Sequence, residues 1–192
     1  MALSKDLSRE KVVEAALSIL RAHGLAAVSM RQVAAALAVQ PSALYWHVES
    51  KQELLGQLAE RILADLADPA AVRPGLPVRE RLRHQVLEIR SALLAVRDGA
   101  EVVSFAQALR PRERSPMRLL HETLGAALPE PDAEWGAQTL AHYILGEVAE
   151  EQNRDELARA GIRPSAQPSE YSAARFLFGA QAIFDGLTHA RT

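Results

Sequence analysis

Apolar side chains recur every three to four residues along almost the whole chain, the spacing that places them on one face of a helix. This spacing predicts nine helices, over residues 7–23, 30–38, 41–48, 50–67, 78–96, 99–109, 113–128, 132–158 and 169–190. Ser8 stands at the start of the first helix as an N-cap, and Gly24 follows its end as a stop signal. No stretch of four or more residues shows the strict alternation of a strand, so we expect an all-α fold.

The predicted helices divide the chain into two parts of different size. The first three are short and joined by tight turns, which is typical of a tri-helical unit in residues 1–51, here called the head. The fourth, 50–67, connects the head to the larger remainder, 68–192, here called the body. A stretch rich in proline at 69–77 is the best candidate linker between them.

The second and third helices have the features of a helix-turn-helix. Ser29 supplies an N-cap for the second helix, and Gln32 stands at the third position of a capping box. In the third helix Leu44 and Val48 are four residues apart and are predicted to face inward. We expect Trp46 to pack in the core with them. Four side chains are then left for the outer face: Ser42, Ala43, Tyr45 and His47.

Small and polar residues at the start of the third helix allow a close approach to the base edges of DNA. Ala43 offers a methyl-sized surface for a thymine methyl group, and Ser42 can donate to a base or a phosphate. Arg31, near the start of the second helix, can fork onto a guanine or clamp a phosphate. Three further side chains are long or cationic enough to reach phosphates: Tyr45, His47 and Lys51.

Charge is distributed unevenly between the two parts. Residues 1–51 carry six basic and four acidic side chains, a net charge of +2, whereas the rest carry 16 basic and 20 acidic ones, a net charge of −4. A basic head on an acidic body fits a protein whose head alone meets a polyanion. The sequence contains no membrane-spanning apolar run, no apolar segment of a secretory signal and no cysteine. We therefore expect a cytoplasmic protein without membrane contact.

The sequence lacks the common motifs of catalysis and cofactor binding. It has no G-x-S-x-G elbow, no G-x-x-x-x-G-K-[ST] phosphate loop and no G-x-G-x-x-G turn. No two of the six histidines stand three or four residues apart, so a helical metal site has no support. We expect neither an enzyme nor a resident cofactor or metal. The alternative to a DNA-binding regulator is a helical dimeric adaptor or scaffold that does not bind DNA.

Residues 25–34 and 41–55 resemble the DNA-binding domain of TetR-family transcriptional repressors. The resemblance extends to the tetracycline repressors in residues 97–100, 142–146 and 176–179. It implies a homodimer with its two heads in successive major grooves of a palindromic operator, and a body that binds a small molecule and then releases the DNA. The family's DNA contacts fall here on Ser29, Arg31, Pro41, Ser42, Ala43, Tyr45, His47 and Lys51.

The resemblance does not extend to the drug site of the tetracycline repressors. The histidine that holds magnesium in those proteins falls at Val103. Their polar drug contacts fall at Ala67 and Gln85, and a nearby aromatic contact falls at Ile89. Only Glu150 is kept from the metal shell, and one carboxylate cannot hold a hard dication against water. The sequence therefore predicts that magnesium-tetracycline is not the effector.

We expect instead a small hydrophobic effector, uncharged or weakly basic, in an apolar pocket of the body. The expected lining is drawn from Gln85, Ile89, Val103, Phe105, Leu109, His121, His142, Tyr143 and Phe176. For dimerisation, the last predicted helix has small residues on one face, which allows close helix packing. The expected interface residues are Gly179, Ala182, Ile183 and Gly186. With residues 135–148 this helix would form a four-helix bundle across a two-fold axis.

Overall fold

The structure, a computed structural model, describes residues 7–66, 75–109, 115–162 and 169–189, with the backbone alone for 169–171 and 189. Within these ranges the chain forms nine α-helices and one 3-10 turn, Leu25–Ala27, and no strand. The prediction of an all-α fold is confirmed. No helix in these ranges is both long and apolar enough to cross a bilayer.

Helices α1 to α9 span Arg9–His23, Met30–Ala36, Pro41–Leu44, Lys51–Ile62, Val78–Leu94, Gly99–Leu109, Pro116–Leu124, Asp132–Arg159 and Ser169–His189. Every predicted helix is present. The third, fourth and seventh are shorter than predicted, because turns replace their last residues after Leu44, Ile62 and Leu124. The linker predicted over 69–77 lies largely outside the described residues.

Side-chain caps fix where the helices of the head begin and end. Ser8 accepts a hydrogen bond from the backbone N–H of Lys11 at 3.3 Å, and Ser29 accepts one from Gln32 at 3.2 Å. Gly24 ends α1 with a φ of 81°, a conformation that favours glycine. The helices of the head and α4 then bury one shared apolar core, formed by Val12, Ala16, Leu20, Val33, Leu44, Leu54 and Leu58.

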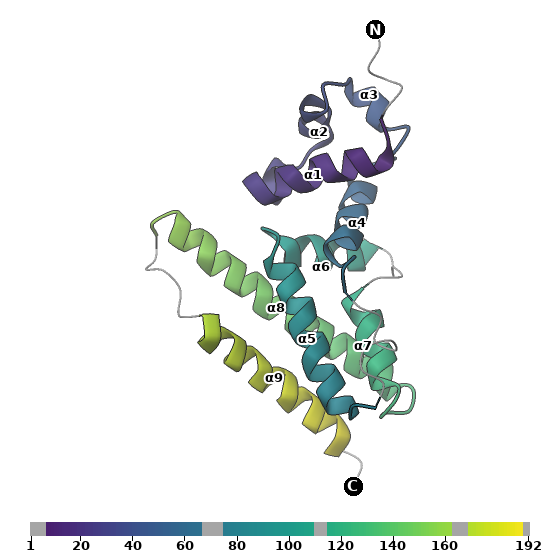
Figure 1. Ribbon diagram of the computed structural model, residues 1–192, viewed down its shortest axis with the longest axis vertical. Helices are drawn as coiled ribbons and strands as arrows, with labels where there is room; N and C mark the ends of the chain where they lie inside the picture. The colour runs from purple at the N-terminus through teal and green to yellow at the C-terminus, as the bar shows by residue number, and fades with distance from the viewer. Residues whose placement is uncertain (1–6, 67–74, 110–114, 163–168, 190–192) are drawn as a thin grey trace.

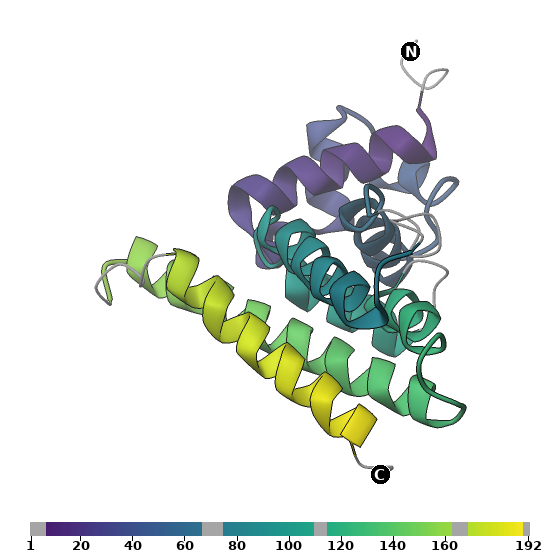
Figure 2. The same ribbon diagram turned by 60° about the horizontal axis from the view of Figure 1, so that its bottom comes forward.

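Helix α4 connects the head to the body and contacts both, packing on α1 and on α6. Figure 1 shows it between the three helices of the head and the rest of the chain. In the body, α8 and α9 run side by side, and α5 lies across them (Figures 1 and 2). The core of the body is formed by Ile89, Leu93, Val102, Leu120, Leu124, Leu140, Ile144 and Phe176.

Arg90 on α5 ties three helices of the body together. Its Nη2 atom donates to both carboxylate oxygens of Glu151 on α8, at 2.8 and 2.7 Å, and to the hydroxyl of Ser172 on α9, at 3.2 Å. The guanidinium also lies 5.5 Å from the ring centroid of Phe176. Because both charged side chains are largely shielded from solvent, the pair fixes the helices relative to one another.

Replacing Glu151 by glutamine keeps the size of the side chain but removes its charge. We expect the free energy of unfolding to fall by about 2 kcal/mol, since Arg90 would lose its charged partner away from water. Urea denaturation measures this loss. The matched control is Glu122→Gln, because Glu122 forms an exposed pair with Arg118 one helical turn away, at 3.1 Å, and should cost under about 0.5 kcal/mol. Equal stability of the two variants would contradict the role given to Arg90.

Candidate nucleic-acid interface and body sites

The third helix presents the outer face that its sequence predicts. Leu44 and Val48 are buried in the core of the head, as expected from their spacing. Pro41 and Ser42 are exposed, and Ala43 is half-buried. Pro41 occupies the first turn of α3, where its missing N–H costs no hydrogen bond. No large side chain projects from the start of α3, so another molecule can approach this part of the helix closely.

Trp46 is the one residue of the predicted helix 41–48 whose placement we predicted wrongly. It is 90% exposed, whereas we expected it in the core. The reason is that α3 ends at Leu44, and the N–H groups of His47 and Val48 both donate to the Leu44 carbonyl. This tight turn directs Leu44 and Val48 inward and leaves Trp46 outside. Tyr45, 52% exposed, lies beside it, so two neighbouring aromatic side chains extend from the head.

Two unpaired cations belong to the elements that flank this face. Arg31 lies in the first turn of α2, and Lys51 is the first residue of α4. Both are exposed, and neither forms an ion pair within the part of the chain that the structure describes. The N-terminus of α4 is capped by Ser50, which accepts from Glu53 N–H at 3.1 Å. Free cations at helix N-termini favour the binding of phosphate.

The two remaining predicted contact residues form hydrogen bonds within the head, Ser29 through its side chain and His47 through its backbone carbonyl. The hydroxyl of Ser29 is used as the cap of α2. His47 is half-buried, and its carbonyl accepts a hydrogen bond from the Nε of Arg9 at 3.1 Å. Our sequence reasoning missed Arg9, which joins the start of α1 to the turn after α3. An arginine at the start of a helix gives no signal that its partner lies 38 residues along the chain.

The head is joined to the body by a contact that we call the latch, formed by Gly24 and Leu25 with Arg97 and Asp98. The carboxylate of Asp98 accepts a hydrogen bond from the Leu25 N–H at 2.7 Å. A Cβ atom on Gly24 would lie 2.7 Å from the same carboxylate oxygen and 3.1 Å from Arg97 Nε. Asp98 itself has a φ of 56°, which places its side chain under the end of α1. The latch thus requires a glycine at position 24.

Side chains of α8 hold the latch from the other side. Gln152 donates to the carbonyls of Leu93 and Val96 at 3.0 and 2.8 Å, and its oxygen accepts from the Ala100 N–H at 3.2 Å. Arg97 donates to Glu156 at 2.5 Å. The turn between α5 and α6 is therefore fixed by α8, so a movement in the body can reach the end of α1 through it.

Four of the predicted effector-pocket residues lie in the interior of the body. Ile89, Val103 and Phe176 are buried. Gln85 is 9% exposed, and its amide nitrogen donates to the Leu119 carbonyl at 2.8 Å. The amide oxygen of Gln85 has no hydrogen-bond partner among the described residues. A buried, unpartnered acceptor is suited to a ligand that brings a donor.

The other five residues of that set are nearer the surface. Tyr143 is half-buried and donates to the Phe176 carbonyl at 3.0 Å, and burial together with Glu147 raises the pKa of Tyr143. His121 contacts the carboxylate of Glu130. The remaining three, Phe105, Leu109 and His142, are exposed. The structure thus separates the predicted set into a buried group and a surface group.

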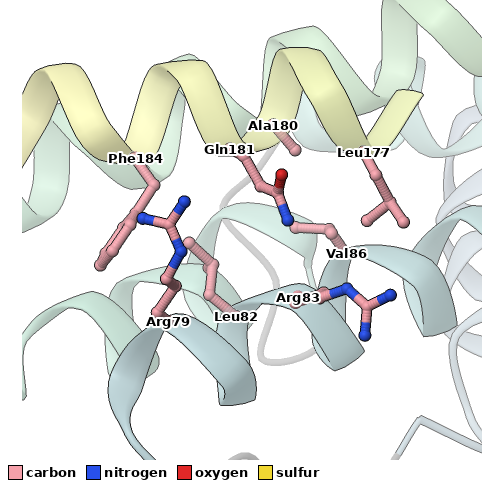
Figure 3. Close-up of a pocket in the computed structure, with 8 residues that line it drawn as sticks. All are labelled: Arg79, Leu82, Arg83, Val86, Leu177, Ala180, Gln181 and Phe184. Atoms are coloured by element: carbon pink, nitrogen blue, oxygen red, sulfur yellow. The ribbon is translucent and has the colours of Figure 1, made fainter. Parts of the chain in front are cut away.

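A narrow cavity of about 10 Å³ lies between α5 and α9. Figure 3 shows Arg79 reaching from α5 to Phe184 on α9, and the side chains that line the cavity close the gap between the two helices. Arg79 lies 6.0 Å from the Phe184 ring centroid and also pairs with Asp185. None of the nine predicted pocket residues lines this cavity. It has room for about one water molecule and forms no effector site as it stands.

The small residues of α9 have two different environments. A Cβ atom on Gly179 would collide with the Tyr143 hydroxyl, so this glycine allows α9 to pack on α8 of the same chain. Gly186 has no neighbour within 4 Å of such an atom, and Ala182 is exposed. Phe178 on α9 and Trp135 on α8 are 76% and 59% exposed. Exposed aromatic and small side chains on these two helices are typical of a surface that associates with another chain.

Two families of known proteins match the chain. Residues 12–58 match the bacterial regulatory proteins of the tetR family, and residues 74–171 match the tetracyclin repressor-like C-terminal domain. The chain belongs to the TetR family. It is therefore a ligand-responsive, DNA-binding transcriptional regulator, and its helix-turn-helix lies in the matched N-terminal segment.

Relatives of known structure and function agree with this family. The chain is 31% identical over 162 residues to the class E tetracycline repressor of Escherichia coli, covering 84% of this chain and 77% of the repressor. BioQ of Mycobacterium smegmatis has 35% identity and a TM-score of 0.83, covering 95% of this chain and 98% of BioQ. A crystal structure of BioQ with its double-stranded DNA operator has 34% identity and a TM-score of 0.76, covering 96% and 99%.

Gly24→Ala tests the latch. We expect a loss of about 2–3 kcal/mol in stability and faster amide hydrogen exchange at Leu25, because the added Cβ meets Asp98 and the backbone is strained. Gly161→Ala is the control, since its φ of 71° carries similar strain but nothing lies within 4 Å. It should cost about 1 kcal/mol and leave Leu25 exchange unchanged. Unchanged exchange in both variants would show that the latch does not protect Leu25.

Gly186→Leu tests the outer face of α9. We expect the protomer to keep its helical content, because position 186 is open and leucine favours a helix over glycine, while sedimentation velocity shows more monomer. Gly179→Leu, by contrast, should lower the stability of the protomer itself, since it collides with Tyr143. A Gly186→Leu protein that sediments as the parent does would remove this face from the dimer interface.

Proposed function

We propose that the chain is a homodimeric repressor that binds a palindromic operator and is released from it by a small hydrophobic effector. The observation that supports this most directly is the outer face of α3. The apolar side chains of Leu44 and Val48 are buried in the core of the head. Pro41 and Ser42 are exposed, and the exposed side chains of Tyr45 and Trp46 lie beside them. Such a helix can enter a major groove without disturbing the core of the head.

We assign base contacts to the residues that reach groove edges and phosphate contacts to those around them. Arg31 has an unpaired guanidinium for a guanine, and Ser42 with Ala43 lies at the exposed start of α3. Lys51 brings its charge to the N-terminus of α4, where the helix amides also favour a phosphate. The remaining contacts of the proposed set are Ser29, Pro41, Tyr45 and His47.

The proposed division of labour follows the helices. Residues 1–51 bind DNA, and residues 50–67 connect the head to the body. Residues 68–192 bind the effector and form the dimer through Ala182, Ile183 and Gly186, since Gly179 packs against Tyr143 of its own chain. We propose that the protein acts in the cytoplasm, where its operator lies, and that it catalyses no reaction. The relatives that it matches are regulators, which supports the second point.

The effector site is proposed in the body around the buried part of the predicted set. Ile89, Val103 and Phe176 supply apolar surface, and the unpartnered oxygen of Gln85 accepts a hydrogen bond. The donors for a magnesium ion do not fit, since Val103 has no ligand atom and Glu150 contacts Arg154. The expected ligand is therefore apolar with a single neutral or weakly basic donor.

Release of DNA is proposed to run through α4 and the latch. The two recognition helices of a dimer must lie about 34–36 Å apart to enter successive major grooves. A ligand that shifts α6 moves α4, which packs on it, and the latch passes the same movement to the end of α1. A coupling of about 1–3 kcal/mol suffices for a 5–150-fold loss of operator affinity.

A gel shift with the duplex flanking the protein's own gene tests DNA binding. We expect a shifted band on a palindromic fragment and none on a fragment with one half-site scrambled, because two heads must bind together. The scrambled duplex is the control for non-specific charge. A protein that shifts no duplex, even at low salt, would act as an adaptor instead of a repressor.

Substitutions in the head separate the two kinds of contact. Arg31→Ala should cost about 1–3 kcal/mol on the operator and relax the preference at one base pair. Lys51→Ala should weaken binding to every sequence and reduce the slope of affinity against salt by about 1. Fluorescence anisotropy over a salt series measures both. Arg83→Ala, an exposed arginine of α5, is the control and should change neither. An equal loss on all sequences would assign Arg31 to a phosphate.

Calorimetric titration with tetracycline tests the effector class. With or without magnesium, we expect no tight binding, since the body offers no ligand set for the ion. The class E relative provides the positive control under the same conditions, as its name identifies it as a tetracycline repressor. Tight binding that depends on magnesium would overturn the proposed apolar site.

A further inference from the structure

A cleft of about 400 Å³ lies where the head meets the body. Its walls come from α1, α4 and α5. Buried side chains of Ile62, Leu66 and Val96 form its apolar part. The volume lies in the range of small-molecule sites, and none of the nine residues of the proposed effector set lines it.

Three charged side chains line the same cleft without partners. Arg61 lies in the last turn of α4, Asp65 lies in the turn that follows this helix, and Glu88 lines the cleft from α5; all three are exposed. None of the three forms an ion pair or hydrogen bond with any described residue. Arg90 of α5, by contrast, pairs with Glu151. A guanidinium and two carboxylates beside an apolar wall therefore remain available to a ligand.

We propose that this junction cleft binds a zwitterionic small molecule with an aliphatic side chain, of the α-amino acid class. The carboxylate of the ligand pairs with Arg61, and its ammonium group lies between Asp65 and Glu88. Its side chain covers the apolar wall. The lining carries both signs of charge, so a zwitterion suits the cleft better than a simple ion does. An anion would meet the carboxylates of Asp65 and Glu88, and a cation would meet the guanidinium of Arg61.

Occupation of the cleft would fix the angle between head and body. Arg21 of α1 also lines the cleft, and it is one turn away from the latch at Gly24 and Leu25. A ligand there touches the head through α1 and the body through α5, so it adds a restraint on the angle that α4 and the latch set between them. This regulatory part rests on the proposed function, whereas the binding itself does not.

L-Leucine is the probe for the site, titrated calorimetrically into the full-length protein. We expect saturable binding with one molecule per chain. N-acetyl-L-leucine and L-leucine methyl ester each lack one charge and should bind at least tenfold more weakly.

Arg61→Met should weaken leucine binding at least tenfold, and Ser91→Trp should abolish it by filling the cleft from an exposed position. Arg83 lies on α5, as Ser91 does, but outside the cleft, so Arg83→Met should bind leucine as the parent does. Absence of saturable binding, or binding unaffected by Arg61→Met and Ser91→Trp, overturns the site.

Operator affinity provides the second measurement. Saturating L-leucine should change the affinity of the parent for its operator more than fivefold and leave that of Ser91→Trp unchanged. If leucine binds and operator affinity stays constant, the site stands and its regulatory role is wrong. If the parent binds operator but not leucine, the repressor function stands and the junction site is wrong. The two failures are therefore distinguishable.

Discussion

The position of the head relative to the body depends on the hydrogen bond from the Leu25 N–H to the carboxylate of Asp98. It joins the end of α1 to the turn between α5 and α6, so a small helical head is held at a defined angle to a larger body. The bond exists because Gly24 has no side chain to keep the carboxylate away. A flexible tether in its place would let the head bind DNA but would transmit nothing from the body.

The latch and α4 form two separate connections between the parts. One connection alone would act as a pivot, about which the head could rotate freely. Two connections at different positions convert a shift of α6 into a defined tilt, because α4 packs on α6 while α1 is held at Asp98. Gln152 stiffens the turn by bonding to Leu93, Val96 and Ala100. In the proposed mechanism, the rigidity of this turn lets a local change in the body alter the spacing of two heads.

The sequence predicts the helices of this protein well, because apolar spacing and capping residues are local signals. Ser8, Ser29 and Gly24 act where their types indicate. Trp46 was misplaced because the end of α3 depends on a turn at Leu44, which helical periodicity does not register. The partner of Arg9 and the contact of Asp98 lie far away in the chain, so no local pattern reveals them. The eight DNA contacts and the nine effector residues stay predictions. The exposure of Arg31 and Lys51 supports the DNA contacts, and the burial of four of the nine effector residues supports a site in the body.

Glycines 179 and 186 illustrate how one pattern can serve two purposes. Both belong to the stripe of small residues that predicts close helix packing, and the stripe alone cannot say which helix approaches. The structure assigns Gly179 to Tyr143 of its own chain and leaves Gly186 open. Phe178 and Ala182 are both exposed and lie on the same side of α9. No other helix within the described residues covers them, so this side is open to a helix of another chain. A protomer that uses its first glycine internally keeps α8 and α9 aligned, and only an aligned pair of helices can form a bundle with a second copy. If the dimer forms through α8 and α9 as proposed, intramolecular packing at Gly179 is thus a condition for it and not an alternative to it.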